Sequence, residues 1–456
     1  MKKNLKQLAA WLQIENQKFE DTVVTGISID TRTIKQGDLF IPFRGEAVNG
    51  HRFVERAFEK GATASLWMKD EPNPPEHLPL IFIDDPEEAL QQMAIAYRKE
   101  HKATFIGVTG SNGKTSSKDI LAGTLSPYFK VQKTIGNFNN QLGLPITILQ
   151  LDEDTEISVL EMGMSGFGEI EFLTKLARPH YAIITNIGEA HMQDLGSREG
   201  IAKAKFEIIQ GLSEEGILFF DGDEPLLQNL VAKTPNLKTQ SFGFTAGQNL
   251  IASNIVATAQ GSSFHVEGEI EGDFFISVLG EHQVKNTLNT LLVSKAIGLT
   301  DEQIRSSLKQ VVLTDMRMQL IPVGDLLFIN DAYNAAPTSM RAAIQFVQQT
   351  TIRSEKWLVL GDMLELGDDE QHFHEEIATH IDAQKIDTVC LYGPRMKWLY
   401  DKLQAKMDAT KLVYSEQSYA PILEKIKKDA SAQTIILVKG SRGMQLETVI
   451  KGIELA

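Results

Sequence analysis

The sequence has only one cysteine among its 456 residues, Cys390. A lone cysteine forms no intrachain disulfide, and its apolar neighbours Val389 and Leu391 indicate a small core residue within a strand. This usage excludes the disulfide-rich class of small secreted domains and fits a reducing compartment.

Long apolar runs are absent as well. No stretch approaches the roughly 20 apolar residues that cross a bilayer. The N-terminus begins with basic residues, but Gln7, Gln13 and Glu15 interrupt its apolar positions before the core of a signal peptide can form. We therefore expect a cytoplasmic protein without membrane insertion.

Positive charge is scarce relative to negative charge. The 45 Lys and Arg against 60 Asp and Glu give a formal net charge of −15. Such a surface disfavours non-specific binding of nucleic acid or of an anionic membrane. Any anionic ligand must therefore be met by a few locally placed cations.

The length and the order of patterns predict three α/β domains. Short β-branched runs alternate with helical patterns, which is typical of parallel α/β units. Between residues 249 and 279 the pattern changes to alternation with glycine-rich turns, which indicates an antiparallel insert. We expect a small α/β domain over 1–100, a central P-loop-type domain with a mostly parallel sheet over 101–314, and a Rossmann-like domain over 315–456. We expect a monomer.

A glycine-rich turn between an apolar strand and a helix is the strongest functional signal. Residues 105–108 are apolar, and the turn ends in Lys-Thr, as in a phosphate-binding P-loop. The general pattern has glycine where this chain has Val108, which indicates a particular subclass. The lysine would reach the β- and γ-phosphates, and the threonine hydroxyl would coordinate Mg²⁺. The residues expected at the nucleotide are Gly110, Ser111, Asn112, Gly113, Lys114, Thr115 and Ser116.

Two more polar residues follow apolar strands and are expected at the same rim of the sheet. Glu161 ends the run 157–160, where its carboxylate could hold the Mg²⁺ of a nucleotide. His191 lies just beyond the strand 181–185. The alternative for each residue is a solvated side chain at a strand end.

Lys205 lies on the apolar stripe of a predicted helix. Ser197 can cap that helix, and Ile201 and Ile209 lie four residues to either side of the lysine. A lysine on a core-facing stripe should have a lowered pKa. A neutral amine can react with carbon dioxide, so we hypothesise a carbamate that binds metal. The alternative is a lysine whose head reaches water.

The P-loop, Glu161, His191 and Lys205 resemble the Mur ligase superfamily of ATP-dependent amide-forming enzymes. The resemblance implies that Lys114 binds the phosphates of ATP. It assigns one Mg²⁺ to Thr115 and Glu161. It assigns a second Mg²⁺ to His191 and a carbamylated Lys205, beside an acyl phosphate.

The resemblance extends along essentially the whole chain. Residues 280–286 resemble the family's segment near the adenine, with Gln283 in place of asparagine, and Asn286 is the implied contact. Arg317 matches the arginine that opens the third domain, and Asp331 matches the acid that binds the ATP ribose. The implied catalytic residues are Lys114, His191, Lys205 and Arg317.

Three segments resemble the subgroup that adds D-alanyl-D-alanine to UDP-N-acetylmuramoyl-tripeptide. They are residues 134–145, 360–367 and 438–447, the first of which resembles a substrate-facing loop. Lys439 and Arg442 are candidates for binding the dipeptide carboxylate, and the alternative is that both are surface cations that close a strand-turn. The substrate contacts proposed in these segments are Asn137, Asn140, Lys439 and Arg442.

The N-terminal segment 28–32 resembles the UDP-binding domain of the same subgroup, with Thr31 where serine is usual. It adds Ser28, Asp30 and Arg32 to the expected substrate contacts. Arg32 could bind a pyrophosphate or uridine, or it could form a structural salt bridge. Whether the third peptide residue is lysine or diaminopimelate stays open.

Several other functions are compatible with parts of this pattern. A tripeptide-forming Mur ligase shares the P-loop, but the Asp-Asn-Pro-Arg signature of the relative that uses diaminopimelate is absent. A folylpolyglutamate synthase shares it too, but the first hundred residues and segment 360–367 argue against that enzyme. A GTPase or motor also uses a P-loop, yet the chain has no Asn-Lys-x-Asp guanine-reading segment. An inactive nucleotide-binding protein would keep Lys114 but would need neither His191 nor Lys205.

Overall fold

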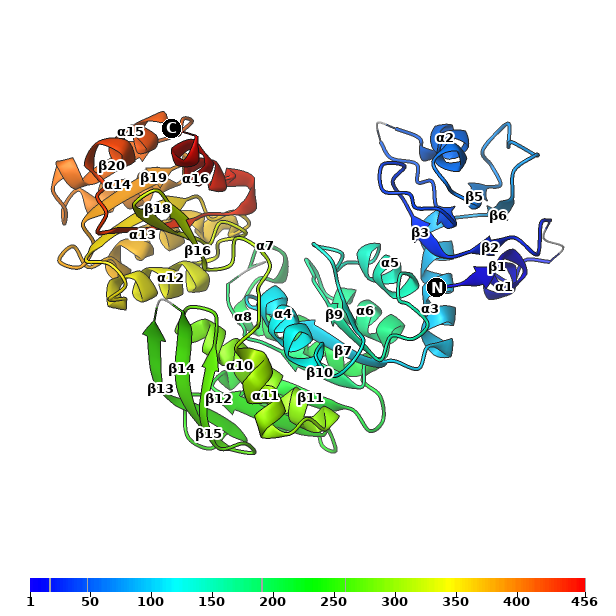
Figure 1. The fold of residues 1–456 in the computed structure, drawn as a ribbon, viewed down its shortest axis with the longest axis horizontal. Coiled ribbons are helices and arrows are strands. Elements are labelled where there is room, and N and C mark those ends of the chain that lie inside the picture. Colours follow the sequence, from blue (N-terminus) through cyan, green and yellow to red (C-terminus); the bar gives the residue numbers. More distant parts are fainter. Residues whose placement is uncertain (16–17, 47, 190–191, 259, 456) are drawn as a thin grey trace.

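The computed structural model describes residues 1–15, 18–46, 48–189, 192–258 and 260–455. Three α/β units follow one another along the molecule, each around its own sheet (Figure 1). A short two-stranded ribbon, β1 with β2, accompanies the first unit. The observed fold class agrees with the expected one. Among the described residues, none of the helices combines the length and apolar character needed to cross a membrane.

The first unit has a parallel four-stranded sheet in the order β3-β4-β5-β6. Its elements are β1 (Lys3–Asn4), α1 (Leu5–Trp11), β2 (Val23–Val24), β3 (Gly26–Ser28), β4 (Asp38–Phe40), η1 (Gly50–Phe53), α2 (Val54–Glu59), β5 (Ala64–Met68), β6 (Leu80–Ile83) and α3 (Pro86–Glu100).

The central unit has a nine-stranded sheet in the order β15-β14-β13-β12-β11-β10-β7-β9-β8. Strands β7 to β13 pair in parallel, and β13, β14 and β15 pair antiparallel, as the sequence predicts. Its elements are β7 (Thr104–Thr109), α4 (Lys114–Leu125), β8 (Val131–Lys133), α5 (Gly143–Leu149), β9 (Ile157–Glu161), α6 (Glu169–Ala177), β10 (Tyr181–Ile184), α7 (Met192–Leu195), α8 (Arg198–Phe206), η2 (Glu207–Gly211), β11 (Ile217–Asp221), α9 (Pro225–Ala232), β12 (Thr239–Gly243), β13 (Leu250–Thr258), β14 (Gly261–Gly268), β15 (Gly272–Ile276), α10 (Glu281–Ile297) and α11 (Asp301–Leu308).

The third unit has a six-stranded sheet in the order β16-β17-β21-β18-β19-β20, in which only β16 is antiparallel to its neighbour. Its elements are β16 (Gln319–Val323), β17 (Leu326–Asn330), α12 (Pro337–Gln349), β18 (Glu355–Gly361), η3 (Gly367–Asp369), α13 (Glu370–His380), β19 (Thr388–Tyr392), α14 (Met396–Leu403), η4 (Ala409–Lys411), β20 (Leu412–Ser415), α15 (Ala420–Asp429), β21 (Thr434–Lys439), η5 (Arg442–Met444) and α16 (Glu447–Glu454).

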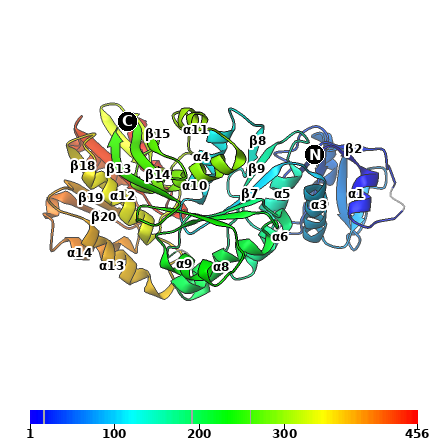
Figure 2. The same cartoon turned by 90° about the horizontal axis from the view of Figure 1, so that it is seen from below.

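The central sheet is covered on both faces by helices, which explains its continuous apolar strands. Helices α4, α10 and α11 lie on one face, and α6, α8 and α9 lie on the other (Figure 2). The second face continues into the first unit, because α3 packs against α5 and α6 within one shared apolar core. The central and third units meet through polar side chains such as Arg317 and Glu189, and through Leu279, which packs into the apolar core of the third unit.

Candidate active site

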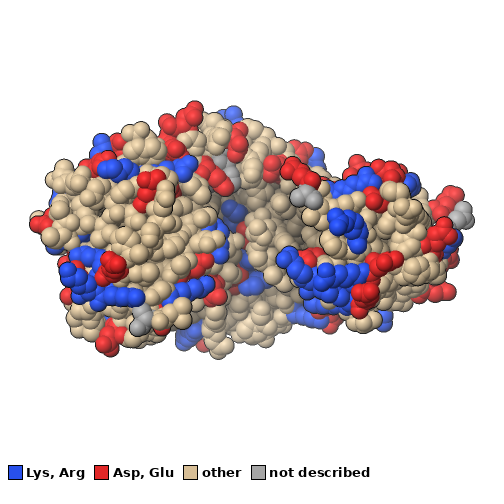
Figure 3. Space-filling view, turned by 90° about the horizontal axis from the view of Figure 1, so that it is seen from above, with Lys and Arg blue, Asp and Glu red and all other residues tan. Residues whose placement is uncertain are grey.

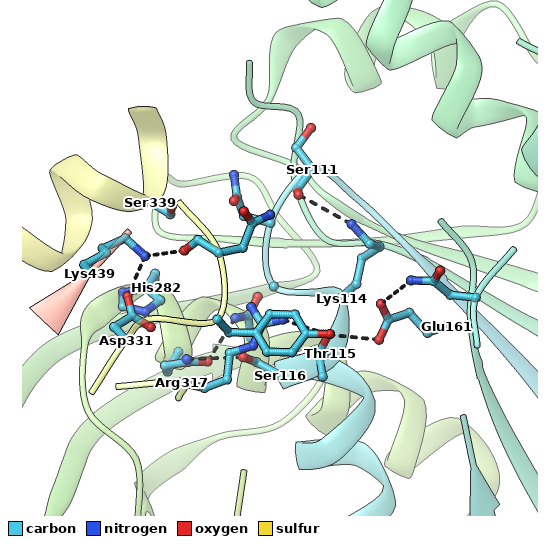
Figure 4. A pocket seen from close by; sticks show the side chains of 17 residues that line it. Ser111, Lys114, Thr115, Ser116, Glu161, His282, Arg317, Asp331, Ser339 and Lys439 are labelled. Atoms are coloured by element: carbon cyan, nitrogen blue, oxygen red, sulfur yellow. Dashed lines mark hydrogen bonds and ion pairs between the residues drawn. The ribbon is translucent and has the colours of Figure 1, made fainter. Parts of the chain in front are cut away.

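A pocket of about 170 Å³ lies between the carboxyl ends of the central strands and the third unit. Seen from above, the surface is hollowed between the third unit on the left and the first unit on the right, and Lys or Arg side chains border the hollow (Figure 3). Figure 4 shows the pocket side chains turned toward one another from both units. The lining residues are Ser111, Asn112, Gly113, Lys114, Thr115, Ser116, Asn139, Glu161, His282, Gln283, Asn286, Arg317, Asp331, Tyr333, Asn334, Ser339 and Lys439.

The P-loop joins β7 to α4 through two glycines with left-handed backbones. Gly110 has a φ of 148° and Gly113 a φ of 81°. A Cβ on Gly110 would lie 1.8 Å from Thr185 Oγ1, and one on Gly113 would lie 2.4 Å from Asn286 Oδ1. Glycine is therefore required at both positions for conformation and for space. The contact also places Asn286, from α10, at the start of the P-loop helix.

Lys114 lies at the N-terminus of α4, where its Nζ donates to the Gly110 carbonyl at 2.8 Å. Burial lowers the pKa of Lys114; Glu161 opposes this shift and Arg317 adds to it. A lysine in this position can exchange its backbone partner for a phosphate oxygen.

Glu161 ends β9 in contact with the P-loop helix. Thr115 Oγ1 donates to Glu161 Oε2 at 2.9 Å, and Asn139 Nδ2 donates to Oε1 at 2.8 Å. Lys118 Nζ lies 3.7 Å from Oε2. The carboxylate is 3% exposed, so the solvated alternative for Glu161 is wrong.

Arg317 lies before β16 and reaches across to the P-loop helix. Its Nη2 donates to Thr115 Oγ1 at 3.0 Å, and its guanidinium lies 4.1 Å from the ring centroid of Tyr333. Among the described residues, Arg317 Nε is buried and has no hydrogen-bond partner. The arginine therefore has spare donor capacity at the pocket.

Asp331 and Lys439 form a buried ion pair on the third-unit wall. Lys439 Nζ lies 2.6 Å from Asp331 Oδ2 and donates to the Asn334 carbonyl at 3.0 Å. The surface-cation alternative is wrong for Lys439, which is 2% exposed. Arg442 does fit that alternative, because its side chain is 53% exposed and pairs with Glu447 at 2.6 Å.

Lys205 is buried within α8, the helix that Ser197 caps by accepting from the Gly200 N–H at 3.1 Å. The side chain is 1% exposed, so the alternative of a head in water is wrong. Burial holds the pKa of Lys205 well below its usual value, and the nearby charge of Lys114 lowers it further. Both effects favour the neutral form of the amine.

His191, the other expected partner of the second metal, lies outside the described residues. Over the ranges that the structure describes, no group of three or more His, Cys, Asp or Glu side chains is arranged to hold a metal ion.

The expected substrate residues of the first unit lie apart from the nucleotide pocket. Ser28 lines a separate cavity of about 570 Å³ between the first and central units, opposite Lys133, Ile135 and Phe138. Arg32 pairs with Asp30 at 2.5 Å. The alternative given for Arg32, a structural salt bridge, is therefore present, and its partner lies only two residues away.

The asparagines of the loop after β8 differ in their exposure and in their hydrogen bonds. Asn137 is exposed, and Asn140 Oδ1 accepts the Gly143 N–H at 2.9 Å at the start of α5. Asn139 is the residue of this loop that contacts Glu161.

Sequence reasoning missed several residues of the pocket. Lys118 lies behind the pocket, where its Nζ is 3.7 Å from Glu161 Oε2, and its spacing of one helical turn from Lys114 could have indicated it. Asn139, Tyr333 and Ser339 had no such local signal, because long-range packing brings them to the pocket.

Comparisons with known proteins agree with this architecture. Three family profiles match: the Mur ligase family catalytic domain over residues 23–98, the Mur ligase middle domain over 108–294, and the Mur ligase glutamate ligase domain over 316–442. A UDP-N-acetylmuramoyl-tripeptide–D-alanyl-D-alanine ligase of Bacillus subtilis is 45% identical over 99% of this chain and 98% of its own. The chain therefore belongs to the Mur ligase family.

Solved structures point to one branch of that family. A crystal structure of MurF from Acinetobacter baumannii matches with a TM-score of 0.89 and 28% identity, covering 100% of this chain and 99% of that one. A MurF ligase from Thermotoga maritima in complex with ADP matches with a TM-score of 0.83 and 26% identity, covering 95% of this chain and 97% of that one.

Proposed function

We propose that this protein is an ATP-dependent ligase that joins D-alanyl-D-alanine to UDP-N-acetylmuramoyl-tripeptide. The main support for this proposal is the similarity of the whole chain to ligases of that name, at up to 45% identity, together with a P-loop pocket shared by two units. The reaction would serve peptidoglycan precursor synthesis, and hence cell shape and division. We further propose that the enzyme acts in the cytoplasm as a monomer.

We assign ATP to the pocket between the central and third units. The backbone of residues 110–116 would bind the phosphates, with Lys114 at the β- and γ-phosphates. Asn286 contacts the P-loop and would lie near the adenine. Asp331 would bind the ribose, and Lys439 holds that carboxylate in place. Arg317 would complete the phosphate site with its unpaired Nε.

The residues present fit a first Mg²⁺. Thr115 and Glu161 offer a hydroxyl and a carboxylate oxygen 2.9 Å apart, which are the hard oxygen donors that Mg²⁺ prefers. Bound there, the ion would neutralise charge on the phosphates. We assign a second Mg²⁺ to His191 and to Lys205 as its carbamate.

The surroundings of Lys205 favour carbamate formation. A neutral amine nitrogen attacks the carbon of CO₂, and the nitrogen then loses a proton to give N–COO⁻. Burial lowers the pKa of this amine and so favours its neutral form, and the Lys114 cation would stabilise the anionic product. Carbon-13 NMR of enzyme equilibrated with labelled bicarbonate should show a carbamate resonance that is absent in Lys205→Arg. An active wild-type preparation without that resonance would contradict the assignment.

The chain's residues would drive the reaction through charge and alignment. A tripeptide carboxylate oxygen attacks the γ-phosphorus of ATP, the bond to ADP breaks, and an acyl phosphate forms. Lys114 and Arg317 would offset the repulsion between the two anions. The amine of D-alanyl-D-alanine then attacks the acyl carbon, loses a proton and expels phosphate.

The other two substrates would flank the ATP pocket. We place the UDP-sugar at the cavity that Ser28 lines, with Asp30 and Arg32 at its edge and the loop of Asn137 and Asn140 leading toward Glu161. We place D-alanyl-D-alanine on the third unit, where Arg442 is the exposed candidate for its carboxylate.

One assay tests the proposed function. Phosphate release from ATP and Mg²⁺ should require both UDP-N-acetylmuramoyl-tripeptide and D-alanyl-D-alanine. Running the tripeptide with lysine and with diaminopimelate in parallel would also settle the third residue. Release no faster with both substrates than with ATP alone would contradict the ligase function.

A further inference from the structure

The third unit meets the P-loop side of the central unit at a second place, through Glu189. Arg341 Nη2, from α12, lies 3.0 Å from Glu189 Oε1. The Thr338 hydroxyl, also from α12, donates to the other carboxylate oxygen. The side chains of Glu189 and Arg341 are 15% and 25% exposed, so this is a partly buried ion pair between units.

The loop that carries Glu189 is fixed to the P-loop. Asn186 Oδ1 accepts the Asn112 N–H at 3.0 Å, and its Nδ2 donates to the Asn112 carbonyl at 2.9 Å. Gly188 lies between the two units, because a Cβ there would be 3.1 Å from Asn112 Nδ2 and 3.4 Å from Thr338 Oγ1. A force on Glu189 is therefore transmitted directly to the phosphate-binding loop.

The other end of the ion pair is coupled to the ATP pocket. Ser339 lies in the same first turn of α12 as Thr338 and lines the pocket on the third-unit side (Figure 4). Within the third unit, Glu376 of α13 lies 3.4 Å from Arg341 Nη1, a longer ion pair than the 3.0 Å pair to Glu189. The position of Arg341 therefore fixes where the third-unit wall of the pocket stands relative to the P-loop.

We propose that Arg341 is a positioning residue that holds the third unit against the P-loop through Glu189. The pair thereby fixes the position of the two walls of the ATP pocket relative to each other. The expected effect on the KM for ATP rests on the proposed function. The expected effect on the distance between the central and third units does not. Arg317 joins the third unit to α4 at Thr115, and the Glu189–Arg341 pair joins it to the loop after β10 at a separate place.

The structural test measures the distance between the central and third units. Spin labels at Lys233→Cys and Lys428→Cys, two exposed positions, report that distance, while the native Cys390 is buried and unlabelled. In the presence of ATP and Mg²⁺, Arg341→Gln should broaden the distance distribution toward longer values. Glu189→Gln should do the same from the other side of the pair. Glu376→Gln is the matched control, because it removes only the contact within the third unit.

The kinetic test uses the same variants in the phosphate-release assay. Arg341→Gln and Glu189→Gln should each raise the KM for ATP about tenfold, the loss expected for one partly buried ion pair between units. Glu376→Gln should stay within about twofold of the wild type. The exchanged pair Glu189→Arg with Arg341→Glu should recover part of the loss.

The outcomes separate this proposal from the proposed function. Distance distributions of Arg341→Gln and Glu189→Gln that match Glu376→Gln would overturn the positioning role. An inactive wild type would contradict the ligase function and leave the distance comparison valid. Thermal unfolding of each variant shows whether it is folded, and either variant of the pair suffices for the test.

Discussion

His282 lines the pocket between the central and third units, and its protonation differs between the folded and unfolded chain. Burial lowers its pKa to about 4, Asp331 opposes that shift, and Lys439 adds to it. The ordinary pKa of histidine is about 6.5. Between these two values the unfolded chain binds a proton that the folded chain does not, so the free energy of unfolding falls as the pH falls through this range.

A variant at this residue gives a pH-dependence prediction. His282→Gln removes the titrating group, so its free energy of unfolding should fall less than that of the wild type between about pH 6.5 and pH 4. Urea unfolding at a series of pH values in that range measures the difference. Curves for variant and wild type that run parallel over the whole range would show that His282 is not the linked group.

At the scale of single residues, the sequence identified those whose role follows from a local pattern. The burial of Lys205 follows from the helical period, and Glu161 follows from its place at the end of an apolar strand. It could not pair Lys439 with Asp331, 108 residues away, or Arg317 with Thr115, 202 residues away. Such pairs depend on how the units pack, which no local pattern encodes.

At the scale of elements, the strands were predicted well because parallel strands buried on both faces are continuous apolar runs. The strands expected at 105–108, 157–160 and 181–185 and around Cys390 are present as β7, β9, β10 and β19. Helix starts are harder to place from a local pattern: α10 begins at Glu281, inside the segment 280–286 for which only a resemblance was available. Its first turn places His282 and Gln283 in the pocket, where Gln283 Nε2 donates to Ser116 Oγ of α4 at 3.3 Å.

Two glycine variants in and before helix α4 separate the contribution of the P-loop turn to ATP binding from that of the helix. Gly113→Ala puts a Cβ into a left-handed residue and 2.4 Å from Asn286 Oδ1. It should destabilise the fold by about 1–2 kcal/mol and weaken ATP binding. Chemical denaturation and calorimetric titration with ATP and Mg²⁺ measure the two effects.

The matched control is Gly123→Ala in the interior of the same helix. A Cβ there meets its nearest neighbour, Val311 Cγ2, at 3.4 Å, which is an ordinary contact. Because alanine favours a helix interior by about 0.5–1 kcal/mol over glycine, this variant should be as stable as the wild type or more so. Equal ATP affinity in Gly113→Ala and Gly123→Ala would refute the role given to the turn.

At the scale of the whole molecule, the two junctions between units are of different kinds. The first and central units share one apolar core, to which α3 contributes Leu90 and Met93. The central and third units meet through polar groups such as Arg317 and Glu189. An apolar core resists shearing, whereas a few ion pairs can separate in water, so motion should concentrate at the second junction.

This difference predicts which parts of the molecule unfold together. Leu90→Ala, at a fully buried position of α3, should cost about 2–5 kcal/mol and speed hydrogen exchange in both the first and central units. Leu399→Ala, equally buried in α14, should speed exchange in the third unit only. Hydrogen exchange followed by mass spectrometry resolves the three units in one experiment. The shared core would be contradicted if Leu90→Ala affected the first unit alone, because α3 would then belong to that unit rather than join two.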